Sequence, residues 1–507
     1  MTKFLPRIRP GAARALAVSA GLMGTFIVPG WSGPTAANAL AGPATQPTAN
    51  CLLPPASCYA PQQFRVAYGV QPLTDHGVDG RGQTIVLVEQ ASPSPASPPA
   101  VTDIRQDLTR FDGVFSLPAA RLGVVNSLAR SAAPWLASPE EVEDTEVAHA
   151  VAPDAAIRIL LVPETATASA GNFAAALTAA VRAGISQGTV ISISASIGEH
   201  YLSSAQAGDL HAALQDAREH HVTVVAASGD SGAASDPLPG AAPVKEVSLP
   251  ASDPLVLAVG GTTLDADNAT GAYLSETTWN TLPTLPGGES SASGGGFSRL
   301  FAQPGYQDGI ADPGHTRGVP DVAADASARS GMAIAVVEGG QEYALTEATG
   351  TSAGAPFWAG LVALADQYAG RDLGFINPAV YGIGRSALYR TAFHDVTTGD
   401  NTVVFPSGTI GGYQAAPGWD PVTGWGSPNA QVLVPLLAHQ TRSRYVVPRR
   451  QRRHRDQRPA RTGLRRERVA SARLGLAVRS SERHGQLHSS DQLGRRLDSV
   501  DVLTSTQ

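Results

Sequence analysis

Cysteine is nearly absent from this chain, which contains only Cys51 and Cys58 in 507 residues. The two residues do not form a C-x-x-C pair, and two thiolates are too few for a cysteine-based structural metal site. The sequence therefore does not favour a metal or redox centre built on cysteine. In an oxidising compartment the pair is expected to form a disulfide that fastens residues 40–58 and takes no part in chemistry.

Long apolar runs are also missing. The apolar stretch Ala15–Val28 is too short to span a bilayer comfortably, and no other long uncharged apolar run follows it. Four basic residues precede this stretch, and Ala37-Asn38-Ala39 offers small side chains for cleavage, as in a secretory signal peptide. We therefore expect residues 1–39 to be removed and the mature protein to be secreted, extracellular and not bound to a membrane.

Basic residues are scarce before residue 441. Residues 441–507 contain 17 Arg against 6 Asp and Glu, a net charge of +11, so the −6 of the whole chain leaves −17 on residues 1–440. An acidic body of this kind is not typical of a nucleic-acid-binding protein. Residues 441–507 lack apolar periodicity, and we expect a disordered tail; a tail that binds an anionic surface is the alternative.

The pattern of apolar residues predicts an α/β fold. Runs of β-branched residues predict buried strands at residues 84–88, 157–162, 189–193 and 222–226, with helical patterns between them at 144–151, 172–183 and 205–220. Continuous apolar strands that alternate with helices are typical of a parallel sheet with helices on both faces.

The segment Gly350-Thr-Ser352-Ala-Gly-Ala-Pro356 leads into an apolar run that predicts a helix, with Pro356 in its first turn. Small neighbours leave the Ser352 hydroxyl accessible. A serine at a helix N-terminus lies beside unpaired amide donors and the positive end of the helix dipole, which suits a nucleophile that must stabilise negative charge. A serine that only caps a helix in a tight turn is the alternative.

Two further segments carry acidic residues. Ser138 and Glu141 form a predicted capping box, and the helix that follows presents Glu140 and Asp144 on one face, one turn apart. Asp230 lies in a glycine-rich turn directly after a buried strand, where α/β proteins keep their sites. A solvated helix face and an ordinary turn are the respective alternatives.

Together these segments resemble the sedolisins, the serine-carboxyl peptidases. The motifs occur in the order of that family: Glu140 with Asp144-Thr-Glu-Val-Ala-His-Ala-Val-Ala-Pro, Ala227-Ser-Gly-Asp230-Ser-Gly, Pro250-Ala-Ser-Asp-Pro-Leu-Val-Leu-Ala-Val-Gly-Gly-Thr-Thr and Gly350-Thr-Ser352-Ala-Gly-Ala-Pro. The resemblance extends from about Tyr59 to Leu437. It implies a subtilisin-like parallel sheet with helices on both faces and a peptidase domain over residues 59–440.

The resemblance also implies a role for each residue of the motifs. Ser352 is the implied nucleophile, Glu140 its general base, Asp144 the residue that orients Glu140, and Asp230 the oxyanion-hole residue; Glu89 is an implied accessory. A glutamate with a reference pKa of about 4.3 is matched to proton transfer in acid. An aspartate donates a hydrogen bond only when it is protonated, so we expect hydrolysis of peptide bonds at acid pH.

A calcium site is a further implication of the resemblance. The carboxylates of Asp395 and Asp420 and the backbone carbonyls of Val396, Ala416 and Gly418 match the C-terminal metal loop of the family. Oxygen ligands of this mixture suit Ca²⁺. The family more often has glycine at position 416, and a carbonyl ligand tolerates alanine there if φ is negative.

The sequence departs from the family in two places and leaves other functions open. Only a short segment separates Ala39 from Cys51, where sedolisins usually carry a long propeptide, and residues 194–198 lack the usual tryptophan of the substrate wall. We expect a monomer that acts on peptides or proteins, internally or by removing tripeptides. The alternatives are an inactive secreted binding protein and a serine esterase of the α/β-hydrolase type, whose histidine could only be His394 or His439.

Overall fold

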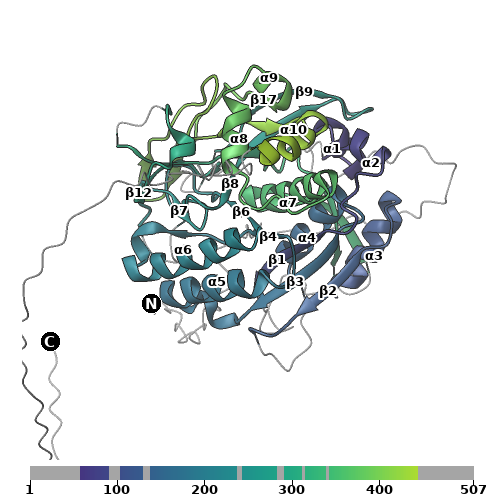
Figure 1. Ribbon diagram of the computed structural model, residues 1–507, viewed down its shortest axis with the longest axis horizontal. Coiled ribbons are helices and arrows are strands. Elements are labelled where there is room, and N and C mark those ends of the chain that lie inside the picture. Colours follow the sequence, from purple (N-terminus) through teal and green to yellow (C-terminus); the bar gives the residue numbers. More distant parts are fainter. Residues whose placement is uncertain are drawn as a thin grey trace, which may run out of the picture. The chain divides into compact units, whose positions relative to one another are not determined.

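The computed structural model describes residues 58–90, 103–129, 137–236, 242–282, 290–310, 314–338 and 342–443 (Figure 1). The expected signal peptide, Cys51 and the tail beyond residue 443 lie outside these residues. Cys58 is buried and disulfide-bonded. No helix in the described ranges is long and apolar enough to cross a membrane.

A mostly parallel sheet forms the centre of the fold. Its order is β14-β8-β6-β4-β1-β3-β2, all paired in parallel, and β9 is added antiparallel to β8. The strands are β1 (Thr84–Gln90), β2 (Arg121–Val125), β3 (Ala156–Val162), β4 (Val190–Ile193), β6 (Thr223–Ala227), β8 (Leu257–Ala266), β9 (Tyr273–Thr278) and β14 (Val322–Asp325). The α/β prediction is confirmed, and β1, β3, β4 and β6 are its four expected strands.

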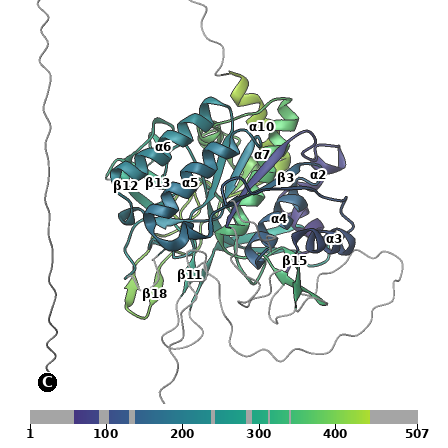
Figure 2. The ribbon, with the colours of Figure 1, turned by 90° about the horizontal axis from the view of Figure 1, so that it is seen from below.

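Helices cover both faces of this sheet, as Figure 2 shows. The long ones are α4 (Pro139–Val151), α5 (Ala170–Gly184), α6 (Ser204–Glu219), α7 (Gly350–Ala369) and α10 (Ala430–Ser443). Alternate residues of β1 point to opposite sides: Ile85 and Leu87 join the core under α4, α7 and α10, while Val86 and Val88 join the core under α5 and α6. β1 is thus buried on both faces, which explains why its sequence is apolar from Ile85 to Val88.

Shorter elements complete the fold around the sheet. They are the helices α1 (Pro61–Ala67), α2 (Gln71–Asp75), α3 (Ile104–Phe115), α8 (Asn377–Gly384) and α9 (Tyr389–Ala392), the 3₁₀ turns η1 (Glu164–Ala168), η2 (Glu199–Tyr201) and η3 (Gly305–Gln307), and the antiparallel pairs β5 (Ile197–Gly198) with β7 (Ser248–Leu249), β10 (Asn280–Thr281) with β11 (Ser291–Ala292), β12 (Gly296–Ala302) with β13 (Thr316–Val319), β15 (Ala333–Glu338) with β16 (Glu342–Glu347), β17 (Phe393–His394) with β20 (Ser427–Pro428), and β18 (Val403–Phe405) with β19 (Gly408–Ile410).

The start of α7 differs from the sequence prediction. The helix begins at Gly350, so Ser352 lies in its first turn and Pro356 in its second; the expectation that Pro356 lies in the first turn is wrong. Proline has no N–H to donate to the carbonyl four residues earlier, which is that of Ser352. That carbonyl instead lies 3.4 Å from Ser194 Oγ. The last described helix, α10, continues to Ser443, past the expected domain limit at residue 440.

The crossing of α4 and α7 depends on a glycine. A Cβ added at Gly360 of α7 would lie 2.7 Å from Val151 Cγ1 and 2.8 Å from Val151 Cβ. Real Cβ atoms do not approach each other so closely, and the short, branched valine cannot turn away without moving its helix. Gly360 therefore sets how closely α4 can approach α7.

We predict that Gly360→Ala lowers the free energy of unfolding by about 1–3 kcal/mol, because the added methyl group overpacks the α4–α7 contact. Gly208→Ala in α6 is the matched control, since nothing lies within 4 Å of a Cβ at that position. The control should be stabilised by about 0.5–1 kcal/mol, as expected for Gly→Ala in a helix. Denaturant titration measures both changes, and equal effects at the two positions would contradict the prediction.

Candidate active site

Ser352 lies in a turn that brings its hydroxyl beside unpaired helix donors. The turn begins at Gly350, whose φ of 75° favours glycine, and a Cβ there would also lie 2.7 Å from Asp230 Oδ2. The Gly350 amide donates to the Ala326 carbonyl at 2.8 Å, whereas the amides of Ser352 and Ala353 have no acceptor within the helix. Ser352 itself is 8% exposed. An anion next to its side chain would meet backbone donors and the positive end of α7.

Glu140 faces Ser352 from the first turn of α4. Burial, followed by the charge of Asp144, raises the pKa of Glu140 well above its usual range, and the Ser352 hydroxyl opposes this shift by hydrogen bonding. Glu140 Oε1 is buried and has no partner at full hydrogen-bond geometry among the described residues. The carboxyl is therefore desolvated and has unused acceptor capacity beside a hydroxyl, which suits a proton acceptor.

Asp144 lies one turn further along α4 and is fully buried. Burial raises its pKa to about 7, against the lowering effect of hydrogen bonds from Ser194 and Glu89. Ser194 Oγ donates to Asp144 Oδ2 at 2.6 Å. Glu89, at the end of β1, is also fully buried, and burial followed by the charge of Asp144 raises the pKa of Glu89 well above its usual range. Because these carboxyls are close together and buried, the ionisation of Glu89, Asp144 or Glu140 disfavours the ionisation of the other two.

Asp230 approaches the same turn from the end of β6. Its Oδ1 accepts the Thr351 N–H and the Thr351 hydroxyl, each at 2.8 Å. Burial, followed by the charge of Asp236, raises the pKa of Asp230 to about 6. The Asp236 carboxylate in turn accepts the backbone N–H of Asp230 at 3.3 Å. Asp230 is thus held beside Ser352 and is protonated below pH about 6, as a hydrogen-bond donor to an oxyanion must be.

The structure brings Ser352, Glu140, Asp144 and Asp230 together, although they come from three separate segments. The sequence analysis did not assign several residues that contact them, namely Ser194, Thr351, Asp236 and Glu143. Ser194 follows directly after β4, so its place at the carboxyl edge of the sheet could have indicated a site. Nothing in the sequence distinguished Glu143 from the other acidic residues of its helix.

The five residues of the expected calcium site also share one region. The Asp395 carboxylate accepts the Gly418 N–H at 3.0 Å and the Tyr389 hydroxyl at 2.8 Å. Asp420 accepts the amides of Ala416 (3.1 Å), Val422 (2.8 Å) and Thr423 (2.9 Å). Both carboxylates therefore bind the loop 416–424, and Val396 follows Asp395 directly. Ala416 does not have a positive φ, which meets the condition for a carbonyl ligand at that position.

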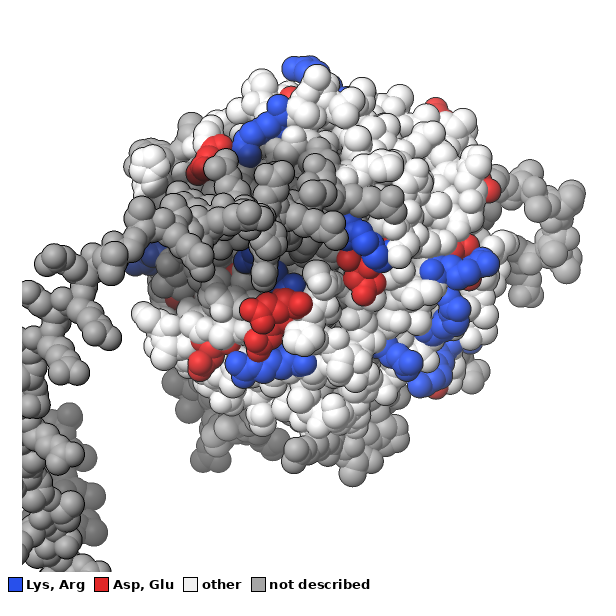
Figure 3. Space-filling model, viewed as in Figure 1, with Lys and Arg blue, Asp and Glu red and all other residues white. Residues whose placement is uncertain are grey.

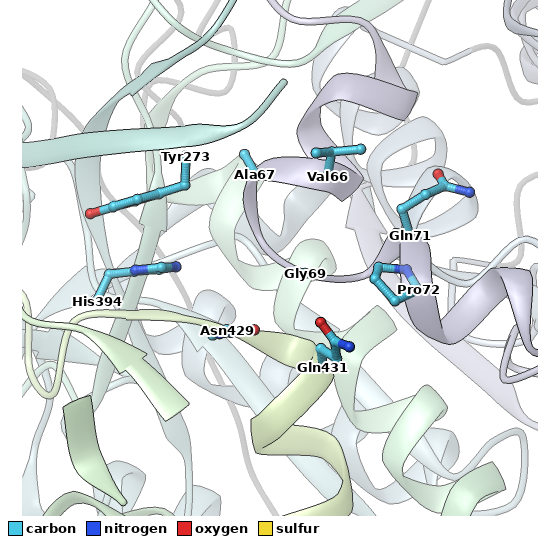
Figure 4. A pocket seen from close by; sticks show the side chains of 9 residues that line it. All are labelled: Val66, Ala67, Gly69, Gln71, Pro72, Tyr273, His394, Asn429 and Gln431. Atoms are coloured by element: carbon cyan, nitrogen blue, oxygen red, sulfur yellow. The ribbon is translucent and has the colours of Figure 1, made fainter. Parts of the chain in front are cut away.

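A pocket of about 340 Å³ lies apart from Ser352 (Figure 4). Its lining includes Tyr273 and His394, whose rings stack with centroids 3.7 Å apart, and the side chains of Gln71, Asn429 and Gln431. Burial lowers the pKa of His394 to about 4. His394 thus belongs to this pocket, which contains none of the four residues around Ser352, so the structure does not support an esterase in which His394 serves Ser352.

Charged side chains are distributed rather than concentrated on the face of the molecule shown in Figure 3. Acidic and basic residues are interspersed there among uncharged ones. The carboxyls around Ser352 are instead buried, and burial raises the pKa of each of them. A cluster of groups with shifted pKa values is typical of a functional site.

We predict that the stability of the folded chain falls as the pH rises from about 4 to about 7. Burial raises the pKa of Asp144 to about 7 and that of Asp230 to about 6, from 3.8 in each case. The folded state therefore binds more protons in this window, so the stabilisation is complete below pH about 4 and is lost as the pH rises through the folded pKa values. Each group contributes on the order of 1 kcal/mol per pH unit within its window.

Urea titrations at pH 4, 5.5 and 7 measure this dependence. The double variant Asp144→Asn, Asp230→Asn should show a flatter dependence, because its amides do not titrate. A midpoint for the native chain that rises with pH over the same range would show that the two carboxyls are already ionised in the fold.

Several known proteins are similar to this chain. The model of the subtilase family matches residues 132–426, which include Glu140, Asp144, Asp230 and Ser352. Kumamolisin of Bacillus sp. (strain MN-32) is 34% identical over 380 residues, which cover 73% of this chain and 62% of kumamolisin. Sedolisin of Pseudomonas sp. (strain 101) is 39% identical over 184 residues, which cover 36% of this chain and 28% of that protein.

A solved structure extends the likeness to the fold. Pseudomonas sedolisin, a serine-carboxyl proteinase in complex with two molecules of pseudo-iodotyrostatin, matches with a TM-score of 0.62 and 27% identity. The match covers 76% of this chain and 99% of the sedolisin chain. Because the family model matches more than half of this chain, and because kumamolisin and sedolisin resemble it, the chain belongs to the subtilase family and, within it, to the sedolisins.

Proposed function

We propose that this chain is a serine-carboxyl peptidase that hydrolyses peptide bonds in acid. The observation that carries the proposal is the placement of Ser352 between two carboxyls of different function. Glu140, with an unpartnered oxygen, lies beside its hydroxyl, and Asp230, with a pKa of about 6, lies beside its turn. The chain spans 62% of the length of kumamolisin and 28% of that of sedolisin.

In the acylation step, Ser352 Oγ attacks the carbonyl carbon of the peptide bond while Glu140 takes the hydroxyl proton. The C=O electron pair moves to the oxygen, which becomes an oxyanion. When the tetrahedral intermediate collapses, the C–N bond breaks and Glu140 returns its proton to the leaving nitrogen. Glu140 thus takes the part that histidine plays in other serine peptidases.

The oxyanion is stabilised from two directions. Protonated Asp230 donates through its carboxyl, and the first-turn amide of Ser352 donates through its N–H. The Thr351 N–H and hydroxyl fix the carboxyl of Asp230 by their bonds to Oδ1, which leaves Oδ2 for the proton. Removing one such donor in other enzymes costs about 10²–10³-fold in kcat.

In the deacylation step, water replaces the serine hydroxyl as nucleophile. The water oxygen forms a bond to the acyl carbon while Glu140 takes a proton from the water. When this second intermediate collapses, the bond from the acyl carbon to Ser352 Oγ breaks and Glu140 returns the proton to Oγ. Asp144 lies beside Glu140 throughout and holds one proton jointly with Glu89, which keeps Glu140 oriented and sets its affinity for protons.

The expected pH optimum follows from the protonation states that this mechanism requires. The base pair of Glu140 and Asp144 must have lost one proton, and Asp230 must keep its own. Activity should therefore rise with the first ionisation of this pair and fall as Asp230, whose pKa is about 6, loses its proton. Because burial also raises the pKa values of Glu140 and Asp144, the two limbs should overlap and the maximum should be narrow. We predict a bell-shaped profile of kcat/KM on the acid side, measured with a quenched peptide library between pH 2 and 8.

Variants separate this mechanism from others. Ser352→Ala and Glu140→Gln should lose at least about 10³-fold in kcat. Asp230→Asn keeps an N–H donor that does not titrate, so it should lose less than Asp230→Ala and extend activity to higher pH. Asp209→Asn, at an exposed position of α6, is the control.

A maximum at neutral or alkaline pH, or full activity of Glu140→Gln, would refute the carboxylate mechanism. Mapping the cleaved bonds distinguishes internal cleavage from removal of tripeptides.

We further propose that Ca²⁺ binds Asp395 and Asp420 with the carbonyls of Val396, Ala416 and Gly418. The donor set consists of hard oxygens, and its two carboxylates already converge on the loop 416–424. Bound there, the ion would offset the repulsion of the two carboxylates and stabilise the loop.

A chelator should therefore lower the Tm of the native chain, and added Ca²⁺ should restore it. At a hundredfold excess over Kd the ion would add about 2.7 kcal/mol. The double variant Asp395→Asn, Asp420→Asn should not respond, whereas Asp154→Asn, which removes a half-buried carboxylate paired with Arg81, should respond like the native chain. A native Tm that is unchanged after complete removal of metal would exclude the site.

We also propose that the chain is secreted. The disulfide at Cys58 supports secretion, because disulfides form in oxidising compartments whereas cytosolic thiols are kept reduced. Peptides and proteins are the substrates that the mechanism requires.

A further inference from the structure

Glu143 is an acidic residue near Ser352 that the mechanism above does not use. It lies on α4 directly before Asp144 and is 7% exposed. Glu143 Oε2 accepts the backbone N–H of Thr349 at 3.1 Å. Thr349 is the N-cap residue of α7, with an extended backbone (φ −141°), three residues before Ser352. The bond therefore connects the helix that carries Glu140 directly to the turn that carries Ser352.

The turn before Ser352 is held from outside at three successive amides. Glu143 accepts the amide of Thr349, the Ala326 carbonyl that of Gly350 at 2.8 Å, and Asp230 that of Thr351 at 2.8 Å. Thr349 makes no side-chain capping bond of its own. Each amide is thus held by a different part of the fold, and Glu143 supplies the contact from α4.

The titratable groups that face Glu143 are all acidic. They are Glu140 and Asp144 on its own helix and Asp230 beyond the end of β6. Burial, followed by the charges of Glu140 and Asp144, raises the pKa of Glu143 well above its usual range. The group is therefore neutral in acid, and a neutral carboxyl oxygen can still accept the Thr349 N–H.

We propose that Glu143 is a positioning residue, which holds the first turn of α7, and with it Ser352, at a fixed place relative to Glu140. The proposal rests on the peptidase function proposed above. Glu143 supplies an acceptor oxygen on a side chain that is long enough to reach the Thr349 N–H. Glutamine has a side chain of the same length with an acceptor oxygen, so it can replace Glu143. A displacement of about 1 Å between nucleophile and base is enough to cost about 10²-fold in rate.

The same helix offers a matched control. Glu146 is also buried, accepts one backbone N–H (that of Ala335, at 2.7 Å) and has its other oxygen unpartnered, as Glu143 does. Burial likewise raises the pKa of Glu146 well above its usual range. Glu146 binds β15 and not the Ser352 turn. Equal substitutions at positions 143 and 146 therefore cost similar packing, while only those at 143 affect the position of Ser352.

The test compares Glu143→Gln, Glu143→Leu and Glu143→Asp with Glu146→Gln and Glu146→Leu in the full chain. We expect Glu143→Gln to keep kcat within about twofold and to leave both limbs of the pH profile in place. Glu143→Leu, which has no acceptor, and Glu143→Asp, which is too short, should lower kcat about 10–100-fold with little change in KM. Glu146→Leu should lower Tm about as much as Glu143→Leu does but keep kcat.

Two results would overturn the proposal: unchanged kcat in folded Glu143→Leu or Glu143→Asp, or a loss in Glu143→Gln equal to that in Glu143→Leu. Amide hydrogen exchange at Thr349 provides a measurement that does not depend on activity. Exchange should be slow in the native chain and in Glu143→Gln, and faster in Glu143→Asp. If this pattern appears while the native chain cleaves no peptide, the proposed peptidase function fails and the contact stands. Equally slow exchange in Glu143→Asp would reject the contact itself.

Discussion

The site depends on burying several carboxyl groups together without a cation to neutralise them. Glu89, Glu140, Glu143, Asp144 and Asp230 all have raised pKa values, and burial is the first cause in each. None of the ion pairs in the described part of the chain includes them. Elsewhere the fold does pair a buried charge: Arg317 binds Asp321 through two contacts of 2.6 Å. An unpaired buried charge is costly, so acid conditions favour the folded state, and the proposed mechanism is one that acts in acid.

Close approach of backbone elements makes this burial possible. The carboxyl ends of β1, β4 and β6 deliver Glu89, Ser194 and Asp230 to one edge of the sheet, while α4 and α7 bring the remaining groups from above it. Small residues let α7 lie close to its neighbours: a Cβ at Gly354 would lie 2.8 Å from Val259 Cγ1, and one at Gly360 would meet Val151. A short distance between helices excludes water, which in turn raises the pKa values on which the proposed mechanism relies.

The same geometry keeps the histidine of α4 away from Ser352. His149 lies on the same helix as Glu140 and is fully buried, but its Nε2 contacts the Asp112 carboxylate and the Pro118 carbonyl, each at 2.9 Å. The acidic face of α4 thus remains turned toward Ser352. In the proposed mechanism one carboxyl is the base and a second is the oxyanion donor. The base must be ionised and the donor protonated, so the two must differ in their affinity for protons.

The sequence by itself determined the class of fold and the candidate residues of the proposed site. Apolar strands that alternate with helices can be buried only between two helical layers, which is why β1, β3, β4 and β6 could be predicted from local patterns. Ser352, Glu140, Asp144 and Asp230 could be named because short motifs with family-like order contain them. The start of α7 could not be predicted correctly, since the tertiary bonds to Ala326 and Asp230, not local propensity, extend the helix back to Gly350.

Only the tertiary structure decided which carboxyls of α4 contact the turn that carries Ser352. Glu143 and Glu146 are three residues apart and look alike in the sequence, yet one binds the Ser352 turn and the other binds β15. The helical pattern places side chains on faces, but the elements packed against each face fix their partners, their burial and hence their pKa values. Such contacts join residues some 200 positions apart in the chain, as between Glu143 and Thr349, and no local pattern carries that information.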